Sequence, residues 1–335
     1  MRSCVAGALV AAVFAAVLPS SAAASEFVTL DNGQDLRATI SPAHGGELAG
    51  FEIKLGGEWR ELIYRARDYA ETAGWRGKAQ TLWPAVGITL DDKGEGKGYR
   101  VDGEYYPMPA HGFARDHPWR LVAQGEDGRG AFAELALADS ERTRVHYPFD
   151  FQLRVEYLLS ADSLVISYTV QAGIDNAGPM PFSIGNHVTF KAPLLGTGEA
   201  ADMRFRNDFP DYLVRAENRT FTGEVVPSSY RGEHLLSALP KRRSVGLGGA
   251  SGAAELTVID PSGLTLGIRH RATAEPEAPV IRFNLWADTE EGFFSPEPWL
   301  GTQNALNSGA GLVRLEPGDD WKWTIEIKPG RAETP

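Results

Sequence analysis

The sequence predicts an all-β fold, a sandwich or barrel of antiparallel strands. Several segments alternate apolar and polar residues with the period of two that is expected of half-buried strands. Turn-forming residues are frequent between them, because the 335-residue chain holds 37 glycines and 21 prolines. No segment shows a sustained helical periodicity. Many short strands joined by regular turns are typical of a sandwich or a barrel.

The predicted strands lie at residues 151–157, 163–170, 256–259, 264–268 and 321–327. The Asp-Pro-Ser-Gly sequence at 260–263 separates two of them and predicts a hairpin. Residues 131–137 fit either a strand or a short helix. Because no linker and no internal repeat interrupts the pattern, we expect residues 25–335 to form one domain.

Residues 1–24 have the pattern of a secretory signal peptide. Arg2 gives a positive start, residues 5–18 are an apolar run rich in alanine, and three alanines at 22–24 form a small-residue cleavage site. The run is shorter than an ordinary transmembrane helix. We therefore expect a periplasmic or secreted protein with no membrane partner after cleavage. Cleavage would remove Cys4, the only cysteine, and with it any disulfide or cysteine-ligated metal.

Composition and motifs exclude several function classes. The net charge of −11 argues against nucleic acid or an anionic membrane as a partner. The chain has no Walker loop, no Gly-x-Ser-x-Gly elbow and no His-Glu-x-x-His helix, and its glycine-rich stretch at 246–252 lacks dinucleotide spacing. We expect neither a cofactor nor a metal. The oligomeric state does not follow from the sequence.

Glu297 has the most distinctive setting of any polar residue. It lies within Phe-Phe-Ser-Pro-Glu-Pro-Trp-Leu-Gly at 293–301, with a proline on each side. Each proline has a fixed φ and no backbone N–H, and the residue before it is pushed toward extended geometry. This framing suits a general base held in a rigid cleft. It also suits a glutamate on an edge strand beside a proline turn.

Three other segments place polar side chains among aromatic residues and glycines. They are residues 75–87 with Arg76, residues 111–119 with His111 and Arg115, and residues 181–190 with His187. Large apolar neighbours favour burial, and a buried histidine or arginine needs a polar partner. Each segment taken alone also fits a satisfied core residue. Together with Glu297 they supply two histidines, arginine and a carboxylate to one β protein.

The order of these segments resembles the aldose 1-epimerase (galactose mutarotase-like) superfamily, nearest to its hexose-6-phosphate epimerase-like branch. His-Gly-Phe-Ala-Arg at 111–115, with Trp119 after it, matches the His-Gly-(Phe/Leu)-Ala-Arg…Trp motif of that branch. Asn-His followed by Phe190 resembles the segment of the acid histidine, and Glu-Pro-Trp at 297–299 resembles that of the base glutamate. The resemblance covers roughly residues 30–328. It implies a large antiparallel β-supersandwich.

The resemblance also implies a reaction and a catalytic pair. A cyclic aldose opens when a base removes the proton of the C1 hydroxyl and an acid protonates the ring oxygen, and closure on the other carbonyl face inverts the anomer. Glu297 would be the base and His187 the acid. Ordinary pKa values of roughly 4.3 and 6.5 would give an ionised glutamate and an accessible protonated histidine near neutral pH.

The remaining residues would bind the sugar. Arg76 would donate to hydroxyl groups, His111 would hydrogen-bond the ring oxygen or hydroxyls, and Trp299 would stack on the apolar face of the sugar, as would Trp83 or Phe190. Arg115 has two interpretations, contact with a substrate phosphate or a structural role through bonds to loop carbonyls.

One departure leaves the substrate open. After Arg-Gly at 76–77 the Gly-Ile-Pro of the family is replaced by Lys-Ala-Gln at 78–80. The signal peptide favours a free aldose, since sugar phosphates are mostly intracellular. Two alternatives remain at this point, a glycoside hydrolase or lyase on the same scaffold, and a carbohydrate-binding protein without catalysis. A glycosidase would need a second carboxylate within about 5–10 Å of the first.

Overall fold

The computed structural model describes residues 26–65, 79–91, 96–241 and 243–332. The predicted signal peptide at 1–24 lies outside these residues, as does Arg76. Within the described ranges no helix is both long and apolar enough to cross a bilayer.

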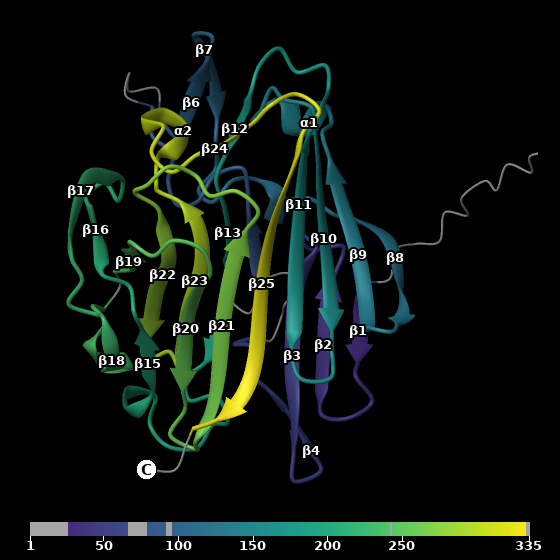
Figure 1. Ribbon diagram of the computed structural model, residues 1–335, viewed down its shortest axis with the longest axis vertical. Helices are drawn as coiled ribbons and strands as arrows, with labels where there is room; N and C mark the ends of the chain where they lie inside the picture. The colour runs from purple at the N-terminus through teal and green to yellow at the C-terminus, as the bar shows by residue number, and fades with distance from the viewer. Residues whose placement is uncertain (1–25, 66–78, 92–95, 242, 333–335) are drawn as a thin grey trace, which may run out of the picture.

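The front layer in Figure 1 is a nine-stranded antiparallel sheet. Its strands, in spatial order, are β18 (Gly232–Leu235), β15 (Arg204–Asn207), β20 (Ala254–Ile259), β21 (Leu264–Ala272), β25 (Asp320–Arg331), β11 (Leu164–Ala172), β10 (Phe151–Leu159), β9 (Gly130–Ala138) and β8 (Arg120–Asp127). Buried and half-buried residues alternate along β10 and β11, as the sequence pattern predicts.

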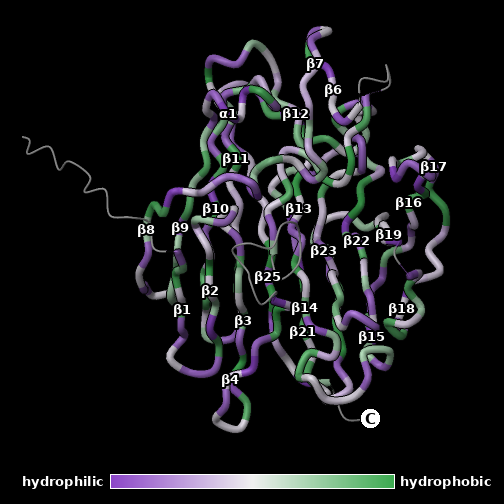
Figure 2. Tube along the Cα trace, turned by 180° about the vertical axis from the view of Figure 1, so that it is seen from behind, coloured by the Kyte–Doolittle hydropathy of each residue, from purple (hydrophilic) through white to green (hydrophobic). Residues whose placement is uncertain are grey.

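The layer behind it consists of two sheets, seen from their outer side in Figure 2. One is a four-stranded sheet of β1 (Val28–Asp31), β2 (Leu36–Ser41), β3 (Glu47–Leu55) and β4 (Glu58–Glu61). The other has the order β17 (Phe221–Pro227), β16 (Asp211–Arg215), β19 (Val245–Gly248), β22 (Ile281–Asp288), β23 (Phe293–Gly301), β13 (Ile184–His187) and β5 (Gln80–Leu82), with β14 (Phe190–Lys191) also paired to β23. Isolated bridges between Leu48 and Ala79 and between Ile63 and Phe190 join the two sheets.

The remaining elements are short. Two further ladders pair β6 (Gly98–Val101) with β7 (Glu104–Pro107) and β12 (Met180–Phe182) with β24 (Val313–Leu315). The helices are α1 (Glu141–Arg144), α2 (Ala305–Ser308) and the 3₁₀ turns η1 (Ala114–Asp116), η2 (Ala200–Asp202) and η3 (Leu236–Ala238). Such short helices agree with the lack of helical periodicity in the sequence.

A buried apolar cluster fills the space between the layers and reaches from β1 to β25. It takes Val155 and Ile166 from the nine-stranded sheet and Phe283 and Leu285 from the eight-stranded one. Each such side chain contributes about 1.5–3 kcal/mol when it is fully removed from water. Because successive residues of a strand face opposite sides, Asn284, between Phe283 and Leu285, faces away from this cluster.

The structure confirms the predicted all-β antiparallel sandwich. The hairpin at the Asp-Pro-Ser-Gly turn is present as β20 and β21, and residues 131–137 form a strand, within β9, rather than a helix. Glu297 lies on an interior strand, so the edge-strand interpretation of its segment is wrong. Strand β23 pairs with β13 at residues 299–300 and with β14 at 293–294, and between these points its ladder partner is β22 alone. Prolines, which lack an N–H, suit a stretch that is paired on one side.

Gly112 allows a close approach between its own backbone and that of Trp83. Its φ is +72°, and a Cβ there would lie 2.1 Å from the carbonyl oxygen of Trp83. Backbone N–H groups of Phe113 and Ala114 both donate to the same oxygen, at 3.0 and 3.2 Å. The close approach therefore places the loop that carries His111 against the Trp83 segment.

We expect Gly112→Ala to destabilise the protein by more than about 3 kcal/mol, because the new methyl group meets rigid backbone. Gly103→Ala is the matched control. Its φ of +86° is also left-handed, but no atom lies within 4 Å of the added Cβ, so it should cost roughly 1–2 kcal/mol. Urea unfolding of both variants measures the difference, and equal losses would contradict the close-approach argument.

Candidate active site

A row of polar side chains crosses the eight-stranded sheet from β16 to β5. Asn284 on β22 lies directly opposite Glu297 on β23, and His187 on β13 lies opposite Gln80 on β5. Arg215 ends β16 and reaches Asn284 across β19. Side-chain alternation and register place each of the five beside the next along this sheet.

The Glu297 carboxylate is held by two donors from the sheet. Asn284 Nδ2 donates to Oε1 at 2.8 Å, and Trp299 Nε1 donates to Oε2 at 3.1 Å. The residue is 1% exposed. Burial raises the pKa of Glu297 to about 8, and the two hydrogen bonds and the charge of Arg215 partly offset this rise.

His187 faces the same carboxylate. Its Nε2 lies 3.7 Å from Glu297 Oε1, and the residue is buried. The Thr189 hydroxyl donates to the His187 carbonyl at 3.1 Å and lies 3.4 Å from Nδ1. With its hydrogen donated to the carbonyl, this hydroxyl can accept from Nδ1–H, and Nε2 is the ring nitrogen that faces Glu297.

Burial also changes the protonation expected from ordinary pKa values. Desolvation lowers the pKa of His187 to about 3 while it raises that of Glu297. Burial therefore opposes the ionised glutamate and protonated histidine that ordinary pKa values predict at neutral pH. Such a pair holds one proton, and burial places that proton on Glu297.

His111 completes the group from a loop between β7 and η1. Its ring centroid lies 5.7 Å from that of His187 and 5.8 Å from that of Trp299. Its backbone has a left-handed φ of 67°, fixed by a bond from its N–H to the Gly87 carbonyl at 2.7 Å. The Gly87 N–H donates to His111 Nδ1 at 3.2 Å. Burial, with the nearby His187, holds the pKa of His111 well below its usual value, so the neutral ring carries its hydrogen on Nε2 as a donor.

Arg115 lies beside the histidines but bonds to protein acceptors. Its Nη1 donates to Gln80 Oε1 at 3.0 Å and its Nη2 donates to the Ala110 carbonyl at 2.9 Å. These contacts brace the loop immediately before His111. Of the two interpretations of Arg115, these contacts agree with a structural role through bonds to loop carbonyls.

The aromatic residues differ in their access to a sugar. Trp299 is 1% exposed and its indole N–H bonds Glu297, so in the structure it orients the carboxylate. Trp83 and Phe190 belong to the main core. Trp286 on β22, which the sequence analysis did not select, is partly exposed and meets the His187 ring edge-on at 5.9 Å.

Arg215 and Asn284 were also missed, and Gln303 was not among the predicted site residues. A signal for Asn284 exists in the sequence, since Arg282 and Asn284 alternate with the apolar residues Ile281, Phe283 and Leu285. Nothing in the sequence around Arg215 distinguishes it from a surface arginine. Arg76 lies outside the described residues, so its predicted contact has no structural description.

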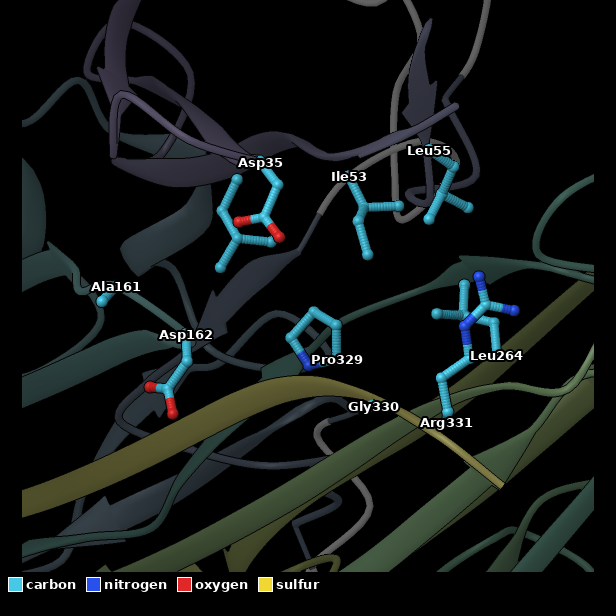
Figure 3. Close-up of a pocket in the computed structure, with 10 residues that line it drawn as sticks. Asp35, Ile53, Leu55, Ala161, Asp162, Leu264, Pro329, Gly330 and Arg331 are labelled. Carbon is cyan, nitrogen blue, oxygen red and sulfur yellow. The ribbon is translucent and has the colours of Figure 1, made fainter. Parts of the chain in front are cut away.

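A hollow of about 240 Å³ lies elsewhere, at the end of β25 (Figure 3). Its wall includes Ile53, Leu55, Leu264 and Pro329, and its lining shares no residue with the row of polar side chains. Asp162 at its rim is exposed and paired with Lys328. The lining of this hollow includes no buried acid–base pair, which distinguishes it from the polar row.

Comparisons with known proteins agree with the geometry. The family model for aldose 1-epimerase matches residues 26–227, which include His111, His187 and Arg215 and end before Glu297. A crystal structure of a protein from Synechocystis sp. PCC 6803 has a TM-score of 0.73 at 24% identity, covering 91% of this chain and 96% of that one. A galactose mutarotase related enzyme from Lactobacillus acidophilus has a TM-score of 0.73 at 19% identity, covering 92% and 100%.

A short segment is similar to a protein of stated activity. It is 44% identical over 50 residues to the Salmonella typhimurium protein named "Putative glucose-6-phosphate 1-epimerase". The match spans 15% of this chain and 17% of that protein.

The raised pKa of Glu297 predicts a pH-dependent stability difference. The unfolded chain loses this proton near pH 4.5, whereas the folded protein keeps it until about pH 8. Rising pH therefore destabilises the wild type across this window, relative to Glu297→Gln, by up to about 1.4 kcal/mol per pH unit. Denaturant unfolding of both proteins at pH 5, 6.5 and 8 measures the difference. Asp162→Asn, at an exposed carboxyl, should give a flat difference; a flat difference for Glu297→Gln would contradict its burial as a neutral acid.

Proposed function

Because the chain belongs to the aldose 1-epimerase family, we propose that it is an isomerase that interconverts the α and β anomers of a free aldose. One observation carries the proposal: the convergence of His187 Nε2 and Glu297 Oε1, 3.7 Å apart, at a buried point of the sheet. One base and one acid suffice for ring opening, and each such group contributes ~10²–10⁴-fold to the rate.

The proton balance of this reaction fits the pair. With the proton on His187, Glu297 takes the proton of the C1 hydroxyl while His187 gives its own to the ring oxygen. The bond between C1 and the ring oxygen breaks and an open-chain aldehyde forms. The pair then consists of a neutral glutamic acid and a neutral histidine, which is the state that burial favours. After rotation about the C1–C2 bond, closure returns both protons and yields the other anomer.

The surrounding residues support binding of a sugar. His111 Nε2–H would donate to a ring or hydroxyl oxygen, and the partly exposed face of Trp286 would pack on the apolar face of the ring. Asn284, Trp299 and Arg215 are the described neighbours that lower the pKa of Glu297, and none of them is a carboxylate. A glycosidase, which needs a second carboxylate nearby, is therefore less well supported.

We further propose that the natural substrate is not phosphorylated. Both Nη atoms of Arg115 already donate to protein oxygens, which commits part of this guanidinium to bracing the loop before His111. The predicted signal peptide supports export, to a periplasm or the exterior, where free sugars are met. The substrate would be an aldose such as glucose or galactose.

We expect Glu297→Gln and His187→Asn each to lower the rate of mutarotation by at least about 100-fold. Polarimetry on freshly dissolved α-glucose, α-galactose and α-glucose 6-phosphate measures it, with Asp162→Asn as a control that should match the wild type. A wild-type rate no faster than buffer on every sugar would refute the function. A marked preference for the phosphorylated sugar would refute the proposed substrate class.

The single shared proton predicts an alkaline limit to activity. Because the pair works with one proton, kcat/KM should fall as pH rises past the pKa of about 8 at Glu297, where that proton is lost. It should not fall between pH 7 and 5, since the next proton binds only near the pKa of about 3 at His187. A pH–rate profile corrected for buffer catalysis tests this, and a steep loss of rate near pH 6 would contradict it.

A further inference from the structure

We infer that Arg215 is a positioning residue for the general base, which it acts on by fixing the Asn284 amide that holds Glu297. The inference rests on the proposed function and concerns how the base is aimed. It is drawn from three adjoining hydrogen-bonded groups on β16, β22 and β23.

The amide of Asn284 links the arginine to the carboxylate. Arg215 Nη2 donates to Asn284 Oδ1 at 2.6 Å, and Asn284 Nδ2 donates to Glu297 Oε1 at 2.8 Å. An amide has one accepting end and one donating end. Because the guanidinium donates to the amide oxygen of Asn284, the NH₂ group of that amide must face the carboxylate. Without the guanidinium the amide is free to turn its oxygen toward Glu297, which repels it.

All five N–H groups of the Arg215 guanidinium meet protein acceptors. Nη1 donates to the Ser244 carbonyl at 3.2 Å and to the Ser244 hydroxyl. With the Gln303 amide oriented by its neighbours, its oxygen accepts from Nε and Nη2, each at 2.8 Å. The second Nη2 hydrogen is the one donated to Asn284. A saturated fork leaves no donor for a sugar hydroxyl, so Arg215 acts through Asn284.

The segment that contains Gly87 makes this arrangement rigid. A Cβ on Gly87 would lie 2.4 Å from Gln303 Cγ, so only glycine admits the Gln303 side chain here. Gly87 is also the residue that bonds both the backbone and the ring of His111. Gly87 therefore bonds His111 directly and packs against Gln303, which accepts from Arg215.

Among the residues that the structure describes, charged or titratable groups face the pair of Glu297 and His187 from β16 and from the covering loop. Arg215 faces Glu297 from β16, His187 faces it from β13, and His111 and Arg115 face His187 from the covering loop. Burial lowers the pKa of Arg215 to about 10, so it remains charged at neutral pH. Its positive charge opposes the rise in the pKa of Glu297.

The test compares Arg215→Met with Arg215→Lys on the full-length protein, with α-glucose or α-galactose as substrate. Arg215→Met should lower kcat by about 10- to 100-fold with little change in KM. It should also move the alkaline limb of the pH–rate profile upward by roughly one pH unit, because a positive charge is lost. Arg215→Lys, which keeps the charge without the fork, should leave the limb in place and recover part of kcat.

Arg282→Met is the matched control, because Arg282 is a buried arginine on the same strand as Asn284 that bonds Glu275 and the Gly252 carbonyl. It should lose stability and leave the alkaline limb unmoved. If Arg215→Met does not fold, Asn284→Ala tests the same link and should lower kcat to a similar degree. In the Asn284→Ala protein, Arg215→Lys should lower kcat less than it does in the wild type, since Arg215 and Asn284 act as a unit.

Three results would overturn the inference. The first is an Arg215→Met enzyme whose alkaline limb is unmoved and whose kcat is within twofold of wild type. The second is an Arg215→Met enzyme with a raised KM and unchanged kcat, which would make Arg215 a direct sugar ligand. The third is a shift of the alkaline limb in Arg282→Met equal to that in Arg215→Met. The proposed function fails separately, by an inactive wild type or by a fully active Glu297→Gln. An active wild type with an inactive Glu297→Gln and a silent Arg215→Met would therefore refute this inference alone.

Discussion

The removal of Glu297 and His187 from water governs the rest of the site. In bulk water the glutamate would be negatively charged and the protonated histidine positively charged, and they would attract each other weakly. Between the strands their neutral forms are favoured, because the charged forms lose hydration that the protein only partly replaces. Asn284, Trp299 and Arg215 supply that partial replacement. In the proposed reaction these residues would keep the ionised carboxylate accessible at a modest energetic cost, as a base that changes charge in every cycle requires.

The sheet provides the precision that these contacts need. Asn284 and Glu297 are opposite each other in register, and Trp299 follows Glu297 by two residues on the same face. Neighbouring strands lie about 4.8 Å apart, which sets the spacing between side chains on adjacent strands. The loops contribute differently, through backbone bonds such as those between Gly87 and His111. The chain belongs to the aldose 1-epimerase family, and its rigid acid–base pair with a covering loop suits a reaction that moves protons and no heavier group.

The strands could be predicted from the sequence because they rest on local signals, and the resemblance to a family singled out Glu297 and His187, which the fold brings together. Alternation identified β10, β11 and β25, the Asp-Pro-Ser-Gly turn identified the β20–β21 hairpin, and flanking prolines drew attention to Glu297. Arg215 could not be found in this way, because its role depends on a neighbour two strands away in the sheet and 69 residues along the chain. Trp299 has the right type and place for a stacking residue, but only the register shows that its indole turns to Glu297. The altered protonation of the pair likewise follows from burial, which no sequence motif reports.

The register between β22 and β23 also limits how such a protein can diverge. Single substitutions in the polar row leave the pairing of β22 with β23 unchanged, so each remaining residue keeps its place in the ladder. An insertion or deletion of one residue in β22 would instead turn Asn284 toward the main core and bring Phe283 or Leu285 to face the sugar. Changes of length are therefore confined to the segments that join the strands. New sugar preferences in this lineage should arise from loops that vary in length above a ladder whose residue count stays constant.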